Sequence, residues 1–392
     1  MSNTSASRPR VLVISPLYYP DEEGLAHYTT EFCRHLQQDA DVTVLTGVRA
    51  AETGPGGVLV LPWLERWDLA GLLLALGRAR FIRPDRILIQ FVPFMYARRG
   101  GINFAIVAAA AVAALHARMG GNGGVQIMFH ELWHWRSSRP RELAMHLAHR
   151  TMVVGLCLAA RDVFCATERF ASEVRDALGG VERPIHLLAV GSNLERAESA
   201  LRPRPPHDGP LRVGLFGSLH ASKNVPMVLR ALQRASARAK GRIKVSVIGL
   251  ERRELSSAVP DLADWLDAEA TVTGWVTADQ AAAKLAEQDF LVSYFQDGVS
   301  SRRGSLLAAL CEGVPVVTTW RDVSDTVFLD QPWVKLLSCD AEEFGAQLET
   351  FLTSAERPFA GVTAAEVRKF YDAHFSWRAL VQRYLDISFP SP

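Results

Sequence analysis

The sequence predicts an α/β protein made of two doubly wound, Rossmann-like domains. Short runs of β-branched and other apolar residues alternate with longer segments of helical periodicity along most of the chain. Strands that are apolar throughout and separated by helices are typical of a parallel sheet covered by helices on both faces. A proline-rich stretch interrupts the alternation once, after which it starts again. We therefore expect two such domains in succession, facing each other across a ligand-binding cleft.

The first domain is expected to span residues 1–200. Its predicted strands are 10–15, 41–46, 86–91 and 125–129, and its predicted helices are 24–36 and 103–119. Each predicted strand is apolar over nearly its whole length, which is typical of strands inside a covered sheet.

A linker is expected at residues 201–210, where the string LRPRPPHDGP holds four prolines. The second domain is expected to span residues 211–370, with strands at 211–217, 243–249, 289–295 and 314–319 and helices at 224–240, 277–288 and 305–311. Residues 371–392 are expected to hold a closing helix that packs across the domains, because apolar side chains recur there at helical spacing, at Leu380, Val381, Tyr384 and Leu385.

Composition excludes several classes of protein. The 43 basic residues nearly cancel the 42 acidic ones, so no overall field attracts nucleic acid and no nucleic-acid partner is expected. Five cysteines without a CxxC spacing argue against a disulfide framework or a zinc-thiolate site and favour a reducing compartment. No apolar signal segment is visible at the start, and the longest apolar run, Phe104–Leu115, is shorter than the ~20 residues that span a bilayer. We therefore expect a cytoplasmic protein.

The string HELWH at residues 130–134 matches the zinc-protease pattern HExxH, but its context does not. That pattern binds zinc only when both imidazoles lie on one helix, whereas His130 here directly follows a predicted strand. Ser137 and Pro140 also stand where a glycine and a third histidine would be needed. We expect no metal, and we interpret His130 as a polar group at the carboxyl end of a strand, facing the cleft; a structural histidine is the other interpretation.

The glycine-rich cradles of nicotinamide, flavin and P-loop proteins are absent from the sequence. Only Gly24 breaks the first strand-to-helix loop, at the predicted start of a helix. A helix start reached through glycine can receive an anion on its free N–H groups, although a glycine there is also an ordinary turn.

Two loops of the second domain bring cations to helix starts. In FGSLHASKNVP, Gly217 ends a predicted strand and Lys223 precedes a helix; in DGVSSRRGSLL, Arg302 and Arg303 precede the next. Both loops follow strands of one parallel sheet and therefore leave the same edge. A cation at a helix start is repelled by the helix dipole and costs the fold ~0.3–1 kcal/mol. Such a cation becomes favourable when an anion binds there, so each loop suggests an anion site and the two together suggest a diphosphate. We expect both cations at exposed helix starts, and only one of the two arginines to face the site.

At this point the chain resembles a family, the metal-independent GT-B glycosyltransferases, and specifically the retaining group called family 4. The resemblance runs through YYPDEEGLAHYT, FHELW, LLAVGSN, FGSLHASKNVPMVLRAL, DGVSSRRGSLLAALCEGVPVVTT and FSWRALVQRYL, in that order. It implies a nucleotide-diphosphate sugar in the second domain, an acceptor in the first, and no cofactor beyond that donor. It also implies that His130 contacts the transferred sugar and that Gly24 contacts the donor. Together with the two cationic loops, it leads us to expect three catalytic residues, His130, Lys223 and Arg303, with Arg302 or Arg303 in place of an arginine that the family has elsewhere. The expected donor site is made of Gly24, Gly217, Ser218, Lys223, Ser300, Ser301, Arg302, Arg303, Gly304 and Ser305.

The sequence departs from the family pattern at three positions. Ser218 stands where an arginine is usual, and Ser300 and Ala308 stand where two glutamates are usual. These departures leave open a degenerate protein that binds a sugar nucleotide or glycan without turnover. A further alternative is an inverting enzyme with His27 as general base, since imidazole titrates near neutrality.

The acceptor is left open as a glycan, a lipid-linked molecule or a small molecule. A basic region lies beside the apolar string LAGLLLALG and consists of Arg78, Arg80, Arg83, Arg86, Arg98 and Arg99. Apolar segments with basic charge favour contact with the inner face of a membrane. A core helix with solvated arginines has the same pattern, and Asp68 and Asp85 dilute the charge, so both interpretations stay open.

Overall fold

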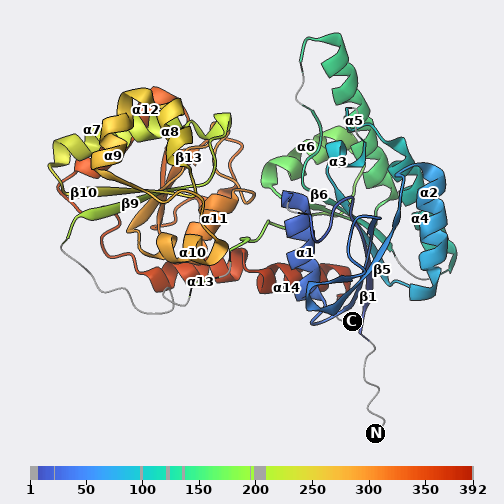
Figure 1. Cartoon of the computed structure of the whole chain (residues 1–392). Helices are drawn as coiled ribbons and strands as arrows, with labels where there is room; N and C mark the ends of the chain where they lie inside the picture. Colours follow the sequence, from blue (N-terminus) through green and yellow to red (C-terminus); the bar gives the residue numbers. More distant parts are fainter. Residues whose placement is uncertain are drawn as a thin grey trace, which may run out of the picture. The chain divides into compact units, whose positions relative to one another are not determined.

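The computed structural model describes residues 8–390 except 22, 98–99, 121–123, 135–136, 195 and 198–208. The chain divides into two compact units, a first unit of Met1–Ala189 with Trp377–Pro392 and a second unit of Val190–Ser376. Each unit is a mainly parallel sheet with helices on both faces (Figure 1). Within the described residues, no helix is both long and apolar enough to cross a membrane.

The sheet of the first unit has eight strands in the order β3-β4-β2-β1-β5-β6-β7-β8, and only the β3–β4 pair is antiparallel. Its strands are β1 (Arg10–Ile14), β2 (Asp41–Gly47), β3 (Thr53–Gly54), β4 (Val58–Leu64), β5 (Arg86–Phe91), β6 (Gly124–Phe129), β7 (Asp162–Cys165) and β8 (Ile185–Leu187). Its helices are α1 (Gly24–Leu36), η1 (Pro55–Gly57), α2 (Leu69–Arg78), η2 (Ala79–Ile82), α3 (Pro93–Tyr96), α4 (Phe104–Gly120), α5 (Pro140–Ala159), α6 (Glu168–Leu178) and, from the end of the chain, α14 (Trp377–Ser388).

The central strand β1 shows why this sheet is covered on both sides. Its residues Val11–Ile14 are all buried, so side chains that alternate between the two faces meet protein on each. Figure 1 shows α2 and α4 on one side of the sheet and α1 and α14 on the other. The strand order reverses between β1 and β5, and in open parallel sheets ligands bind beyond the carboxyl ends of the strands at such a point.

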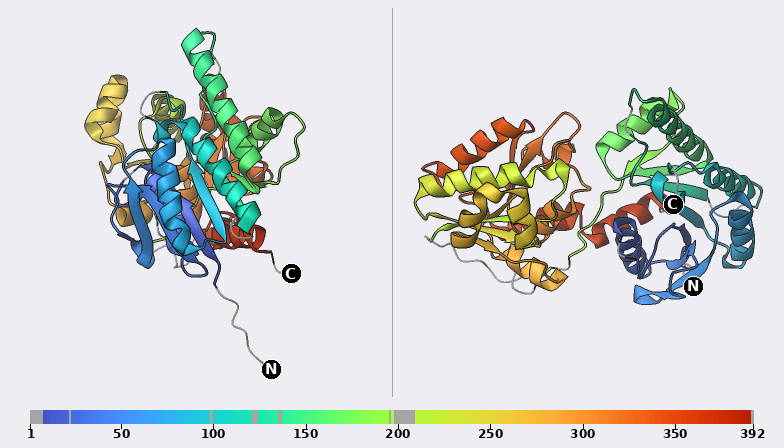
Figure 2. Two further views of the ribbon diagram at one scale, coloured as in Figure 1. Left: turned by 90° about the vertical axis from the view of Figure 1, so that its right-hand side faces the viewer. Right: turned by 45° about the horizontal axis from the view of Figure 1, so that its top comes forward.

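The sheet of the second unit has six parallel strands in the order β11-β10-β9-β12-β13-β14. They are β9 (Leu211–Phe216), β10 (Ile243–Ile248), β11 (Ala270–Val272), β12 (Phe290–Val292), β13 (Val316–Trp320) and β14 (Val334–Ser338). The helices are η4 (Ala221–Lys223), α7 (Val225–Ala239), α8 (Arg252–Ala258), η5 (Pro260–Leu262), α9 (Ala263–Ala268), α10 (Ala278–Ala286), α11 (Gly304–Cys311), η6 (Thr326–Phe328), α12 (Ala341–Thr353) and α13 (Ala364–His374). Here the order reverses between β9 and β12. Figure 2 gives two further views of the same layers.

The boundary between the units differs from the predicted one. The first unit ends at Ala189 and not at residue 200, because Val190, Ser192 and Arg196 bond within the second unit. The Val190 N–H donates to the Ser301 carbonyl (3.3 Å), the Ser192 N–H to the Tyr371 hydroxyl (3.2 Å), and Arg196 Nε to the Cys311 carbonyl (2.8 Å). Residues 201–208 of the predicted linker lie outside the described residues.

The predicted closing segment 371–392 also divides between the units. Helix α13 packs on α11 within the second unit, whereas α14 packs on α1 and belongs to the first. A buried polar network fixes α14: the Tyr384 hydroxyl donates to Gln126 Oε1 (2.9 Å), and Gln126 Nε2 donates to Asp162 Oδ2 (2.9 Å) and to the Ser388 hydroxyl (2.9 Å). The segment 371–392 is therefore shared between the two units, and the expectation that its helix packs across the domains stays a prediction.

The α14 network gives the first prediction. Tyr384 is fully buried, and its ring packs edge-on against Phe32 at 5.3 Å, so Tyr384→Ala leaves a cavity and costs about 3–5 kcal/mol. Hydrogen exchange read by mass spectrometry should show faster exchange in peptides of the first unit and unchanged exchange in those of the second. The exposed Gln382 of the same helix is the matched control, and Gln382→Ala should leave both unchanged. Equal loss of protection in both units would contradict the division.

Candidate functional site

Gly217 and Lys223 form the centre of the candidate site in the second unit. Gly217 directly follows β9 and has φ 129°, a conformation that residues with a side chain rarely adopt. A Cβ atom on Gly217 would lie 2.7 Å from Lys223 Nζ and 3.7 Å from Ser305 Cβ. The lysine ammonium therefore lies directly over the carboxyl end of β9, and glycine is needed there for both backbone and space.

The charge of Lys223 has no acidic partner among the described residues. Its side chain is half-buried, and burial together with the neighbouring Arg303 guanidinium lowers the pKa of the ammonium. A half-buried cation beside a second cation loses hydration and gains repulsion. An anion bound at this point would relieve both costs.

Arg303 brings the second cation, from the loop that joins β12 to α11. Its guanidinium pairs with Asp297, lies 4.5 Å from the centre of the Phe295 ring, and leaves the side chain 21% exposed. Burial lowers its pKa, whereas Asp297 opposes that shift. Arg302, the preceding residue, is exposed. The expectation that both Lys223 and Arg303 lie at exposed helix starts is corrected, because both are half-buried.

The small residues of the same loop take different positions. Ser301 is 7% exposed, and its N–H donates to Asp325 Oδ2 (2.6 Å), as does its hydroxyl. The Ser301 N–H and hydroxyl are therefore engaged in hydrogen bonds within the protein and do not face an open surface. The Ser300 carbonyl accepts from the Arg303 N–H (3.1 Å), and Ser218 is exposed beside Gly217.

Gly304 begins helix α11 and faces open space. A Cβ atom built on Gly304 meets nothing within 4 Å, and its φ is not positive, so neither packing nor backbone requires glycine there. Ser305 follows it and lies next to Gly217, as the 3.7 Å spacing shows. The positive end of the α11 dipole is therefore directed to the same place as Lys223. The Gly304 and Leu306 N–H groups donate to the Arg302 and Arg303 carbonyls (3.0 and 2.9 Å). Among the described residues, the Ser305 N–H is therefore the one of the first turn that faces this place without such a bond.

Topology explains why these loops meet. β9 and β12 are hydrogen-bonded neighbours at the reversal of strand order, so the loops after them leave the same edge side by side. A small hollow of about 10 Å³ between them is lined by Gly217, Ser218, Lys223, Ser293, Phe295 and Ser305, among others. Cations, hydroxyl groups and a helix N–H group at one point suit a phosphate-bearing ligand.

One candidate at this edge was missed by the sequence analysis. Trp275 follows β11, is 76% exposed, and is preceded by Gly274 with φ 68°. Its N–H donates to Glu251 Oε1 (2.8 Å), which holds the turn in place. An exposed tryptophan at the same sheet edge as Lys223 offers a flat apolar face. The signal in the sequence was a Gly-Trp pair directly after a strand.

His130 lies in the first unit, at the carboxyl end of β6 as predicted. Its ring is 8% exposed, its Nε2 lies 2.7 Å from Gln90 Oε1, and its centroid lies 4.4 Å from the Tyr28 ring in an edge-on contact. Residues 130–134 are not helical, so the HExxH string does not form the zinc-protease arrangement. Within the described part of the chain, no three His, Cys, Asp or Glu side chains gather in a way that could hold a metal ion.

Gly24 and His27 lie at the start of α1 in the same unit. Gly24 is the first residue of α1 and exposed, its φ is not positive, and a Cβ atom there would meet nothing within 4 Å. No side chain caps this helix, so its first N–H groups are open. His27 is exposed on the first turn.

Comparison with known proteins follows the same division. Residues 210–354, which cover most of the second unit, match the family model described as "Glycosyl transferases group 1". This part of the second unit is therefore similar to a group 1 glycosyltransferase domain. A search of curated proteins finds no significant match.

Solved structures match along the whole chain. A glycosyltransferase from Rickettsia africae is 11% identical with a TM-score of 0.69, covering 98% of each chain. HepE of Anabaena, solved in complex with UDP, is 12% identical with a TM-score of 0.65 and covers 96% of this chain and 99% of its own. The lipopolysaccharide outer core galactosyltransferase WaaB is 11% identical with a TM-score of 0.65, over 97% and 99%. These likenesses establish the GT-B fold, as the sequence resemblance predicted.

The geometry of Lys223 gives a prediction on stability. Because the folded state lowers the Lys223 pKa, the unfolded state holds this proton more tightly, and the charged lysine costs the fold free energy at neutral pH. Lys223→Met should leave the ligand-free protein equally stable or up to about 1 kcal/mol more stable at pH 7. The difference should begin to shrink as pH rises past the lowered pKa of the folded state, and should vanish only above the ordinary lysine pKa of the unfolded chain, about 10.4.

Urea unfolding at pH 7 and pH 10 measures this effect. Lys284 is the control, because it is exposed and pairs with Glu287 at 3.0 Å, and Lys284→Met should bring no gain. A clear loss of stability in Lys223→Met at pH 7 would show that the ammonium has a structural partner.

Proposed function

We propose that this protein is a retaining, metal-independent glycosyltransferase that moves a hexose from a nucleotide-diphosphate sugar to an acceptor hydroxyl, in glycan or glycoconjugate biosynthesis. The observation that carries the proposal is the half-buried, unpaired Lys223 ammonium over Gly217, beside Arg303 and the start of α11, within the residues that match the group 1 glycosyltransferase family model. A diphosphate supplies the negative charge that this arrangement lacks.

The proposed reaction uses these cations on the leaving group. The bond from the anomeric carbon to the diphosphate oxygen breaks, and its electron pair stays on the diphosphate. The acceptor oxygen bonds to the anomeric carbon on the same face, while its proton passes to that leaving oxygen. Negative charge therefore grows on the diphosphate, where Lys223 and Arg303 stabilise the transition state more than the ground state.

The other parts of the proposal rest on placement and resemblance. Trp275 offers its exposed face to the nucleobase at the edge that holds Lys223. The structural neighbour HepE was solved with UDP, which supports a nucleoside diphosphate as ligand. In the first unit, we propose that His130, oriented by Gln90, contacts the transferred sugar, and that the open start of α1 at Gly24 approaches the donor.

A second candidate function is a sugar-nucleotide or glycan-binding protein without turnover. The observation in its favour is the absence of carboxylates at Ser300 and Ala308; Ala308 is buried in α11 and has no polar group. In this case the cation site would bind nucleotide, but no sugar would be released or transferred.

The stereochemistry of donor hydrolysis tests the proposal without a known acceptor. UDP, GDP, ADP, CMP and dTDP sugars are first ranked by thermal shift, since a ligand at 100 times its dissociation constant stabilises by ~2.7 kcal/mol. Proton NMR then follows the best donor in water, and the sugar released first should have the donor's anomeric configuration. Release of the opposite anomer by the wild type, together with loss of that release in His27→Ala, would establish the inverting alternative. Binding without release from any donor would establish the binding protein.

Single substitutions test the role of the cations. Lys223→Ala and Arg303→Met should each lower turnover about 100- to 1000-fold and weaken nucleotide binding less, because the contacts strengthen in the transition state. Arg303→Met keeps the packing on Phe295 but leaves Asp297 unpaired, so its melting temperature is measured alongside. The exposed Arg302 is the matched control, and Arg302→Ala should keep near wild-type turnover. Wild-type turnover in both variants would exclude the phosphate role.

A further inference from the structure

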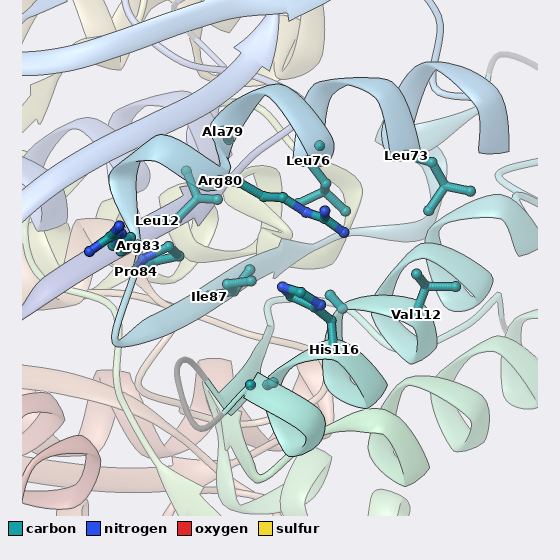
Figure 3. Close-up of a pocket in the computed structure, with 14 residues that line it drawn as sticks. Leu12, Leu73, Leu76, Ala79, Arg80, Arg83, Pro84, Ile87, Val112 and His116 are labelled. Atoms are coloured by element: carbon teal, nitrogen blue, oxygen red, sulfur yellow. The ribbon is translucent and has the colours of Figure 1, made fainter.

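The first unit contains a slot that the proposed reaction does not use. It lies between α2 with η2 on one side and α4 on the other, and its volume is about 340 Å³ (Figure 3). Leu12 of β1 and Ile87 of β5 line it, and so do Arg83 and Pro84, which precede β5. The slot therefore reaches the amino end of β5, whereas His130 follows the carboxyl end of β6. Its size is at the lower end of the range for small-molecule sites.

Small residues in the two walls create this space. Gly77 of α2 and Ala113, Ala117 and Gly120 of α4 line the slot, where larger side chains would close the gap between the helices. A Cβ atom on Gly77 or on Gly120 would meet nothing within 4 Å. The remaining wall is aliphatic and includes Leu73, Leu76 and Val112, so the interior suits a hydrocarbon chain.

The polar groups of the slot are cationic or basic. Arg80, Arg83 and His116 line it, and Figure 3 shows the Arg80 and His116 side chains reaching into the space between the helices. Neither arginine has an ion pair among the described residues. The nearest acidic residues in sequence are occupied elsewhere: Asp68 caps α2 and pairs with Arg66 at 2.9 Å, and Asp85 pairs with Arg10. The slot thus combines an apolar interior with unneutralised positive charge.

Arg83 stands in a conformation that favours glycine. Its φ of 49° and ψ of 59° place it in the left-handed region, which costs an ordinary residue roughly 1–2 kcal/mol. Strain of this kind concentrates at ligand-binding positions. It also provides a useful variant, because glycine would relieve the strain while removing the cation.

Exposed apolar side chains surround the slot on the same helices. Val112, Leu115 and Met119 recur at spacings of three and four, so they lie along one face of α4. They are 49%, 55% and 73% exposed, and Leu74 of α2 and Phe81 of η2 are 58% and 66% exposed. Arg78 and Arg118 add positive charge at the ends of the two helices. Apolar side chains interleaved with basic ones are the pattern of a surface that rests on an anionic bilayer.

We propose that the slot takes one acyl chain of an anionic membrane phospholipid, whose phosphate binds Arg80 and Arg83, while the exposed faces of α2, η2 and α4 rest on the bilayer. This surface includes only some of the arginines in the basic region expected from the sequence. Arg86 does not contribute, because its Nη2 donates to the Ser388 carbonyl (2.5 Å) and its guanidinium lies over the Phe389 ring. Arg98 and Arg99 lie outside the described residues.

Sedimentation with vesicles tests this proposal on the whole chain. Wild-type protein should bind vesicles of phosphatidylglycerol and phosphatidylcholine and bind pure phosphatidylcholine much more weakly. Arg80→Ser with Arg83→Gly should weaken binding roughly thirty-fold, because each basic residue near the surface contributes about five-fold. The matched control removes two exposed arginines of the same unit, in Arg150→Ser with Arg175→Ser, and should bind like wild type.

A second variant separates the acyl chain from plain electrostatic attraction. Gly77→Leu with Ala113→Leu fills the slot and keeps every cation, and its melting temperature verifies the fold. Both proteins are extracted from the vesicles and examined by native mass spectrometry. The wild type should retain a bound lipid, and this variant should not. The proposal is overturned if this variant retains lipid like wild type, if the two charge variants bind vesicles equally, or if the wild type ignores vesicles and binds only free dodecanoate in calorimetry.

Discussion

The site depends on two cations that lie close together and have in total one carboxylate partner, Asp297, among the described residues. Lys223 lies over Gly217 with no carboxylate partner in the described chain, and Arg303, paired with Asp297, lies near enough to lower the Lys223 pKa. A ligand-free fold gains nothing from this arrangement, because burial and repulsion both disfavour the charged form. We propose that it becomes favourable when a phosphate group enters, and on that proposal the rest of the second unit supports an anion site.

The support comes from topology and from a few fixed turns. β9 and β12 are neighbours where the strand order reverses, so two loops that are far apart in sequence leave the same edge. Asp325 holds the second loop through the Ser301 N–H and hydroxyl, and Glu251 holds the turn at Trp275. A sheet built in this way positions cations rigidly before the ligand arrives, as preorganised charge stabilisation requires.

The layered fold, and the meeting of the two cationic loops at one sheet edge, could be predicted from sequence, because the strands that flank both reversals are apolar and central. Strands β3, β4, β7, β8, β11 and β14 were missed, and most of them are short. The boundary between the units was predicted too late in the chain, because a proline-rich composition does not reveal the long-range hydrogen bond from Arg196 to the Cys311 carbonyl. Local patterns likewise could not show that Asp325 engages Ser301, that Arg303 rather than Arg302 is half-buried, or that alanines in α4 leave a slot.

The most direct test of the central claim is the titration of Lys223 itself. The chain has six lysines, so NMR of protein labelled at the lysine ε-carbons can resolve and assign each ammonium by substitution. The account predicts that the Lys223 pKa lies below the ordinary lysine value in the ligand-free protein, and that it rises when a nucleoside diphosphate that binds the protein, tested as UDP, GDP and ADP in turn, is added. A Lys223 that titrates like the exposed lysines, and does not respond to a nucleotide that the protein binds, would contradict the account.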